Sequence, residues 1–487
     1  MQRIVGLALA ALLSAALGAG VLPAPARATV VPGRSPAPAA VAAAAPGSFE
    51  LVGHDPLMNR GMNAALAVRG DYAYVGSRTD GTHPNAGVMV VNVADPSAPE
   101  VVGQIGPANR GETSREMRIW PEQDLLIVLY LASNCSFIIH ACSPEQMTKD
   151  DVIRFYDIAG DRAAAPELIA EYLPSQNPHE FYLWQDPDDR KRALLYMSTP
   201  GGSDQMMVTD ISRARAGKFT ELVRWKTVIP ESGDNRLHSL SLSTDGRRAF
   251  LAYLQGGFFV IDTSELATGK SKPRIKAVTP IHRRVHWEGP GAHSAVKLFG
   301  RPYALVTDEV YGQIPGLLPN HGCPWGWTRL ISIKNPVKPK VVAEYRTEAN
   351  EPEYCESADN SPDRQSLSSQ SAHNPTLTRN LAFITWHSQG LQAISVKNPA
   401  RPVPVAEFVP TPEPVVVQED PVLSSGRDKV VMWSYPVVKD GLIYVVDVRN
   451  GLYILRYKGP FAAEVSATRF LEGNSNLGDA LRFEPPR

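Results

Sequence analysis

The segment from residue 238 to residue 278 decides the fold, because it contains four short strand-like runs separated by turns. It reads His238-Ser-Leu-Ser-Leu242, the turn Thr244-Asp-Gly-Arg247, and then Ala249-Phe-Leu-Ala-Tyr253, Gly257-Phe-Phe-Val-Ile-Asp262 and Pro273-Arg-Ile-Lys-Ala-Val278. Short apolar runs bounded by Gly, Asp and Pro are typical of strands joined by tight turns. The segment therefore predicts one four-stranded antiparallel sheet.

A second motif recurs where the third strand of such a unit is connected to the fourth. It reads Asp95-Pro-Ser-Ala-Pro99, Asn335-Pro-Val-Lys-Pro339 and Asn398-Pro-Ala-Arg-Pro402. The Asp/Asn-Pro pair favours a turn, and the second proline can begin an edge strand, which needs no inward N–H. Repetition every few tens of residues in a β-rich chain indicates a propeller or a solenoid.

With these three turn motifs in register, the sequence resembles the LVIVD-repeat family of β-propeller proteins. The resemblance covers nearly all of the chain after residue 48. It implies an all-β fold in which four-stranded blades form a closed ring. It implies little about chemistry, because propellers host many unrelated functions.

Counting first strands predicts seven blades. Their leading residues are Met62, Arg115, His179, His238, His293, His373 and Trp433. The last unit has only three strands of its own, so we expect the N-terminal strand Phe49-Glu-Leu-Val-Gly53 to complete it and close the ring. Six or eight blades remain an alternative if the long stretch from 293 to 373 is misread.

The chain ends are predicted to lie outside the propeller. Residues 1–28 have an early arginine, an apolar run and the small-x-small site Ala26-Arg-Ala28, which indicates a signal peptide cleaved after Ala28. An uncleaved anchor is the alternative. We assign residues 29–47 to an Ala/Pro-rich linker, 48–460 to the propeller and 461–487 to a C-terminal tail. The protein is therefore expected to be secreted, with no transmembrane segment in the mature chain.

The composition narrows the class of partner. Of the 487 residues, 43% are hydrophobic and 20% are charged, and the formal net charge is -1. This composition excludes a mostly disordered chain and a multi-span membrane protein. Without a basic excess we expect no nucleic-acid partner. The expected partner is an unidentified extracellular ligand or a cell-surface protein.

Four cysteines in an exported protein predict two disulfides. Cys135 and Cys142 are close together in one segment, whereas Cys323 and Cys355 lie in two later segments. Three pairings are possible, and we favour 135–142 with 323–355. A metal–thiolate site is disfavoured, because the sequence has no C-x-x-C spacing.

Polar residues gather where the propeller is predicted to have its top face. In a propeller, the start of each first strand and the end of each second strand meet on one face around the central channel. Four successive blades begin with histidine, at His179, His238, His293 and His373. The other candidate ligand-binding residues predicted for this face are Arg78, Arg115, Glu116, Glu180, Glu309, His387 and Arg449.

The four leading histidines have three interpretations: a metal site, a structural role, or a site for a non-metal ligand. Converging imidazoles can bind copper or zinc, with Glu116 and Glu180 fixing the ring tautomers. The architecture is similar to other seven-bladed propellers whose inner histidines hold copper, including the selenium-binding protein/methanethiol oxidase family, although no motif specific to that family is present. Alternatively, the histidines are structural, because some propeller families bury a histidine before the first strand of each blade.

Two classes of function follow from these patterns. The first is an exported module that binds a ligand or a protein through its histidine-rich top face. The second is a histidine-ligated metalloenzyme, such as an oxidase, with copper or zinc at the mouth of the channel. Other catalytic classes are disfavoured, because G-x-S-x-G, P-loop and G-x-G-x-x-G motifs are absent from the sequence.

Overall fold

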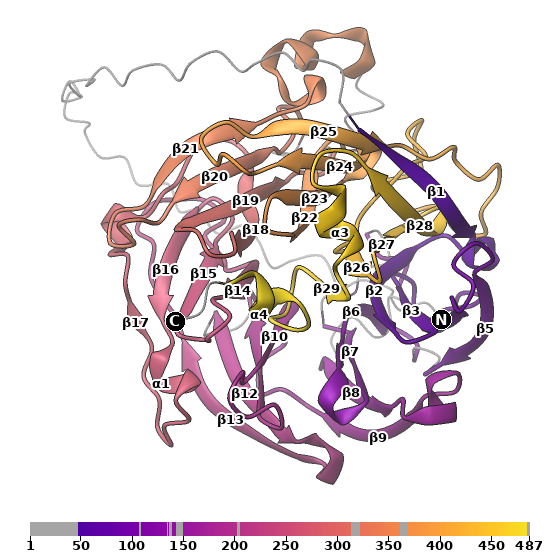
Figure 1. Cartoon of the computed structure of the whole chain (residues 1–487), viewed down its shortest axis with the longest axis horizontal. Coiled ribbons are helices and arrows are strands. Elements are labelled where there is room, and N and C mark those ends of the chain that lie inside the picture. The colour runs from indigo at the N-terminus through magenta and orange to yellow at the C-terminus, as the bar shows by residue number, and fades with distance from the viewer. Residues whose placement is uncertain are drawn as a thin grey trace, which may run out of the picture. The chain divides into compact units, whose positions relative to one another are not determined.

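The computed structural model describes residues 47–106, 109–133, 135, 139–142, 150–201, 205–312, 322–360 and 369–484. The predicted signal peptide and nearly all of the predicted linker lie outside these residues. The described chain belongs to one compact unit, Val41–Arg487. It consists of antiparallel sheets set around a centre, with only short helices between them (Figure 1). The predicted all-β propeller fold is confirmed.

Groups of four consecutive strands repeat along the described chain. The groups are β2 (Asn63–Arg69), β3 (Tyr72–Ser77), β4 (Val88–Asn92) and β5 (Glu100–Ile105); β6 (Thr113–Trp120), β7 (Leu125–Leu131), β8 (Val152–Asp157) and β9 (Glu167–Tyr172); β10 (Glu180–Gln185), β11 (Ala193–Ser198), β12 (Met206–Arg213) and β13 (Lys218–Trp225); β14 (Ser239–Leu242), β15 (Arg248–Ala252), β16 (Phe258–Asp262) and β17 (Lys276–Ala277); β18 (Gly291–Lys297), β19 (Tyr303–Glu309), β20 (Thr328–Ser332) and β21 (Lys340–Tyr345); and β22 (Ala372–Leu377), β23 (Leu381–Trp386), β24 (Gly390–Ser395) and β25 (Val403–Phe408). Within each group the strands pair in chain order, and a single pair, Ser77 with Ser114, joins the first two groups.

The core lies between neighbouring sheets. Every residue of the second strand β7 is buried, whereas the fourth strand β9 has no fully buried residue. A strand covered on both faces needs a continuous apolar run, and Leu125–Leu131 supplies one. The strands near the centre of each sheet are therefore held rigidly by packing. Polar side chains at the ends of these strands consequently have little freedom to move.

The N-terminal strand β1 (Ser48–Asp55) pairs with a strand near the other end of the chain. Its partner is β28 (Gly451–Lys458), with Phe49 opposite Tyr457. β28 continues through β27 (Leu442–Asp447) to β26 (Val437–Lys439). The Phe49 ring lies 5.6 Å from the Tyr457 ring and 6.1 Å from the Phe383 ring, so it also contacts the neighbouring sheet. Figure 1 shows β1 along the outer side of β28.

The C-terminal segment, predicted as a tail, packs into the propeller. After the short helix α3 (Ala462–Ser466), β29 (Phe470–Leu471) pairs with β26, and α4 (Ala480–Phe483) follows. The side chain of Asn476 then accepts a hydrogen bond from Gln185 N (2.8 Å) and donates to the carbonyl oxygens of Gln185 (2.7 Å) and Thr244 (3.0 Å). One asparagine thus ties the segment to two sheets.

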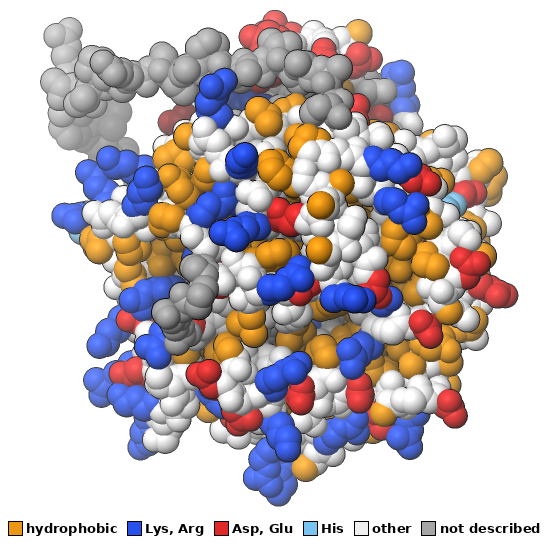
Figure 2. Space-filling model, in the orientation of Figure 1, with side chains coloured by type: hydrophobic (Ala, Val, Ile, Leu, Met, Phe, Trp, Pro, Cys, Tyr) orange, Lys and Arg blue, Asp and Glu red, His pale blue; other side chains and the backbone are white. Residues whose placement is uncertain are grey.

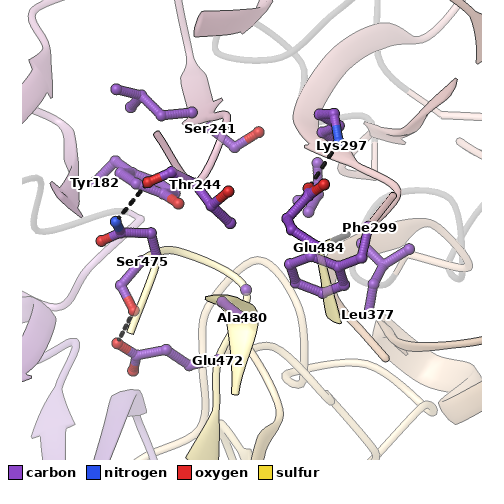
Figure 3. A pocket seen from close by; sticks show the side chains of 14 residues that line it. Tyr182, Ser241, Thr244, Lys297, Phe299, Leu377, Glu472, Ser475, Ala480 and Glu484 are labelled. Carbon is purple, nitrogen blue, oxygen red and sulfur yellow. Dashed lines mark hydrogen bonds and ion pairs between the residues drawn. The ribbon is translucent and has the colours of Figure 1, made fainter. Parts of the chain in front are cut away.

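This segment lies near the centre of the face seen in Figure 1. It forms one side of a pocket whose other walls come from β10, β14, β18 and β22 (Figure 3). Within it Ser475 donates to Glu472 (2.6 Å), and Lys297 pairs with Glu484 (2.7 Å). Figure 2 shows the same face with acidic and basic side chains interspersed and almost no histidine.

Both predicted disulfides are confirmed. Cys135 is bonded to Cys142 and Cys323 to Cys355, with Cα–Cα distances of 5.8 and 5.5 Å. These distances are usual for disulfides. Among the residues that the structure describes, no helix is long and apolar enough to cross a bilayer.

Replacing Phe49 tests the contribution of β1 to stability. Phe49→Ala should lower the free energy of unfolding by about 2 kcal/mol, because a half-buried ring that contacts two sheets is removed. Glu50→Ala, on the opposite face of the same strand, is the control and should leave stability unchanged. Urea denaturation followed by tryptophan fluorescence measures both. Equal stability of the two variants would contradict a structural role for this strand.

Replacing Asn476 tests the role of the C-terminal segment. Asn476→Ala should cost about 2–3 kcal/mol of unfolding free energy, because buried backbone groups of two sheets lose their partners. Arg469→Ala, in the same segment but with a side chain that is 86% exposed, serves as the control. A midpoint of denaturation unchanged by Asn476→Ala would mean that the segment is dispensable.

Candidate functional site

The four predicted histidines converge in the structure. His179 and His238 directly precede β10 and β14, while His293 and His373 lie within β18 and β22. Successive ring centroids are 4.6, 4.0 and 4.2 Å apart. His387, which follows β23, extends the arc, with its ring 5.0 Å from that of His373. Repetition of one strand position in adjacent sheets therefore brings the imidazoles side by side.

Glu309, the last residue of β19, lies against this arc. Its Oε2 is 3.3 Å from His293 Nε2, and its Oε1 is 3.1 Å from His373 Nε2 and 3.4 Å from His387 Nε2. The glutamate side chain is 7% exposed and the three imidazoles are 1% exposed. We refer to His179, His238, His293, His373, His387 and Glu309 as the His–Glu cluster.

Hydrogen bonds on the far side of two rings assign their tautomers. His373 Nδ1 lies 2.7 Å from the carbonyl oxygen of Trp433, which can only accept. His293 Nδ1 lies 2.9 Å from Ser294 Oγ, whose own hydrogen is donated to Asn374 Oδ1. Both rings therefore carry hydrogen on Nδ1, and each neutral ring presents the lone pair of Nε2 to Glu309.

The hydrogen bond at Nδ1 also assigns the tautomer of His387. Its Nδ1 lies 2.9 Å from Ser369 Oγ, which donates its hydrogen to the carbonyl oxygen of Val310. When the three rings are neutral, their Nε2 lone pairs face one carboxylate, so acceptors face acceptors. Neither Glu309 Oε1 nor His387 Nε2 has a well-aligned hydrogen bond to any described group, despite their separation of 3.4 Å. Unsatisfied buried acceptors cost about 1–3 kcal/mol each, whereas a cation between them would satisfy all of them.

Burial favours the neutral form of His179, His238, His293 and His387. It holds the pKa of His179 and of His293 well below the ordinary value, and it lowers the pKa of His238 to about 4. For Glu309, burial raises the carboxyl pKa, but charge attraction to His293 and His373 and hydrogen bonds with His373 and His387 outweigh it and hold that pKa well below its usual range. Neutral imidazoles and an ionised carboxylate are the protonation states that metal binding requires.

The ligand atoms at the other end of the row of histidines, formed by His179 and His238, are also close together. His179 Nε2 lies 3.0 Å from His238 Nε2, a separation close to the roughly 3.4 Å expected for two nitrogens on one tetrahedral ion with bonds of about 2.0–2.1 Å. Glu180 Oε1 is 3.8 Å from His238 Nδ1. Burial, reinforced by the charge of Glu116, raises the pKa of Glu180 well above its ordinary value. Three groups of His and carboxylate ligands result, and within each the ligand atoms lie within 4.8 Å of one another.

A small cavity adjoins the cluster. Its lining residues are Arg115, Glu116, His179, Glu180, His238, His293, Glu309, Tyr311, His373 and Trp433. The free space among them holds about one water-sized sphere. Such a space fits an ion or a very small ligand better than an organic cofactor.

The predicted arginines have different positions. Arg115 lines the cavity, with Nη1 3.0 Å from His140 Nε2, and its guanidinium lies 5.1 Å from the Trp433 ring centroid. Arg78 lies 5.4 Å from the same centroid but does not line the cavity, and its Nε donates to Asp420 (2.8 Å). Arg115 is therefore the predicted arginine that faces the cavity.

Arg449 and Glu116 have structural partners. Arg449 pairs with Glu419 (2.9 Å) in the 410–431 connection, away from the cavity. Glu116 lines the cavity, but it also lies 3.1 Å from Arg118. The structure therefore brings all the predicted residues except Arg78 and Arg449 to the cavity or the cluster.

Sequence reasoning missed several residues of the site. Tyr311 lines the cavity, and its position two residues after Glu309 was an available signal. Trp433 was identified only as the start of a strand, yet its carbonyl oxygen orients His373 and its ring packs against Arg115. Ser369, which orients His387, lies in a long connection and has no sequence signal.

The chain is similar to several solved structures, at low sequence identity and with TM-scores below 0.5. Solved structures similar to this chain include the β-propeller domain of Cps50 (Swd1) from Myceliophteria thermophila, with 9% identity, a TM-score of 0.46, and 85% of this chain and 99% of that chain covered. Another is Sqt1 from Chaetomium thermophilum bound to the N-terminus of the ribosomal protein L10, with 13% identity, a TM-score of 0.44, and 82% and 89% covered. These scores say nothing about function.

Two further comparisons concern the sequence. No curated protein matches the chain, so the similarity to the selenium-binding protein/methanethiol oxidase family stays a hypothesis. Residues 60–105, which span β2 to β5, match the family model of the LVIVD repeat. The chain therefore contains an LVIVD repeat within a β-propeller, as its turn motifs predicted.

Proposed function

We propose that this protein is a secreted β-propeller that binds a transition metal ion, copper or zinc, in the His–Glu cluster. The observation that carries the proposal is that the Nε2 atoms of three imidazoles face the Glu309 carboxylate, while each Nδ1 lies against an oxygen atom on the other side. Nitrogen and carboxylate donors at 3.1–3.4 Å from one another match the ligand set of such ions. The Nδ1 partners Ser294, Ser369 and the Trp433 carbonyl group orient the rings, as the outer partners of metal ligands usually do.

The proposed scaffold is a ring of seven blades. The six groups of four strands would form the first six blades, and β26, β27 and β28 together with β1 would form the seventh. Residues 1–28 would be a signal peptide, 29–47 a linker, 48–460 the propeller and 461–487 the C-terminal segment. Two disulfides support export, because such bonds persist in oxidising compartments.

Catalysis is the second candidate function. The cavity beside the cluster brings Arg115, Tyr311 and Trp433 close to the proposed ion. A metal with an open position next to a buried guanidinium can bind and polarise a small oxygen-containing ligand. The metalloenzyme hypothesis, oxidase included, rests on this arrangement. The extracellular or cell-surface partner stays a prediction.

Metal analysis tests the proposed function directly. Protein purified without a histidine tag, incubated with Zn²⁺ or Cu²⁺ and then desalted should retain metal, measured by inductively coupled plasma mass spectrometry. His293→Ala should lower the metal content, because it removes a ligand. His282→Ala, at an exposed position, should leave it unchanged. Wild-type protein that retains neither metal would overturn the proposal.

Replacing Glu309 distinguishes a metal site from a cluster that is stabilised by ion pairs between protonated imidazoles and the Glu309 carboxylate. In metal-free protein at neutral pH, Glu309→Gln should raise the free energy of unfolding by about 1–2 kcal/mol, because the amide can donate hydrogen bonds to the facing lone pairs. Glu407→Gln, on an exposed part of β25, is the control. Thermal and urea denaturation after chelation measure the effect. A less stable variant would show instead that imidazolium–carboxylate ion pairs hold the cluster.

A further inference from the structure

The His–Glu cluster contains more ligands than one ion can use. Zinc sites are usually four-coordinate, with three protein ligands where the site is catalytic. The cluster offers five imidazoles and a carboxylate; His293, His373 and His387 are buried, whereas His179, His238 and Glu309 are partly buried. A single four-coordinate ion would leave two or more of these imidazoles without a bond to metal. The number of donors therefore points to more than one ion.

Two of the three sets of donors share Glu309. One consists of His238, His293 and Glu309, and the other of Glu309, His373 and His387. In each set the ligand atoms lie within 4.8 Å of one another, and only Glu309 belongs to both. His179 adds a further nitrogen to the first set, since its Nε2 is 3.0 Å from His238 Nε2.

The orientation of Glu309 fits a bridge between the sets. Its Oε2 faces His293 at 3.3 Å, while its Oε1 faces His373 at 3.1 Å and His387 at 3.4 Å. A carboxylate that presents one oxygen to each side can bind two ions about 3.5–4 Å apart, the separation found in two-metal sites. A ligand for one ion would not need both oxygens directed at different imidazoles.

We propose that the His–Glu cluster is a dinuclear metal centre bridged by Glu309. One ion is bound by His179, His238, His293 and Glu309 Oε2, and the other by His373, His387 and Glu309 Oε1. The inference rests on the proposed function and adds the number of ions and the bridging ligand.

The second ion has fewer protein ligands than the first. His373, His387 and Glu309 form a set of two imidazoles and one carboxylate, which leaves coordination positions open. Tyr311 stacks against His387, with ring centroids 6.2 Å apart, and it lines the cavity together with Arg115. The open positions of this ion would therefore face the residues best placed to contact a small ligand.

Metal stoichiometry tests the dinuclear centre. Untagged protein is loaded with excess Zn²⁺, desalted and analysed for zinc by mass spectrometry and for protein by amino-acid analysis. The wild type and the control His282→Ala should each contain two ions per chain. His293→Ala and His387→Ala should each contain one, because each removes a ligand from a different set. The double variant should contain none.

Electron paramagnetic resonance of the Cu²⁺-loaded wild type provides a second readout that needs no variant. Two Cu²⁺ ions bridged by a carboxylate couple magnetically, so the signal should account for less copper than is bound. In His387→Ala the remaining ion should give its full signal.

The outcomes separate the two proposals. One ion per wild-type chain with a full Cu²⁺ signal would overturn the dinuclear centre but leave the proposed metal site standing. No retained ion would overturn both.

Discussion

The His–Glu cluster is organised by one contact, in which the carboxylate of Glu309 faces the Nε2 atoms of three imidazoles. Glu309 lies 3.1–3.4 Å from three Nε2 atoms, and each of these rings has its hydrogen directed away, to an acceptor on Nδ1. In a low-dielectric interior such a group of acceptors is stable only when positive charge lies among them. The proposed metal site rests on this contact.

The propeller makes this contact possible by repetition. Successive sheets deliver the start of their first strands to one place, so the rings of His179, His238, His293 and His373 are spaced 4.0–4.6 Å apart. The inner strands are buried, which restricts their movement and so preorganises the ligands. The group that orients His373 comes from a neighbouring sheet, because the Trp433 carbonyl group precedes β26 whereas His373 lies in β22.

Both ends of the chain stabilise this arrangement. β1 pairs with β28, about 400 residues away in sequence, and Asn476 binds the backbone of β10 and of the turn after β14. Contacts of such long range are costly in chain entropy and must be offset by apolar burial and satisfied hydrogen bonds. The hydrogen bonds of Asn476 and the packing of Phe49 against two sheets meet this requirement. Ligands drawn from different sheets then keep fixed separations.

The sequence by itself determined the elements of the fold and the identity of most donors. Alternating strands, Asp/Asn-Pro turns and the cysteine spacing are local patterns, so the propeller and both disulfides could be predicted. The four leading histidines, Glu309 and His387 were found because they occupy equivalent strand ends. Only the tertiary structure decided which side chains meet. In the structure, Tyr311 lines the cavity and Ser369 contacts His387. Arg449 pairs with Glu419 instead of facing the cavity, and the C-terminal segment packs against the propeller. The physical reason is that a strand or turn is specified by its own residues, whereas a hydrogen-bond partner in another sheet leaves no local signal in the sequence.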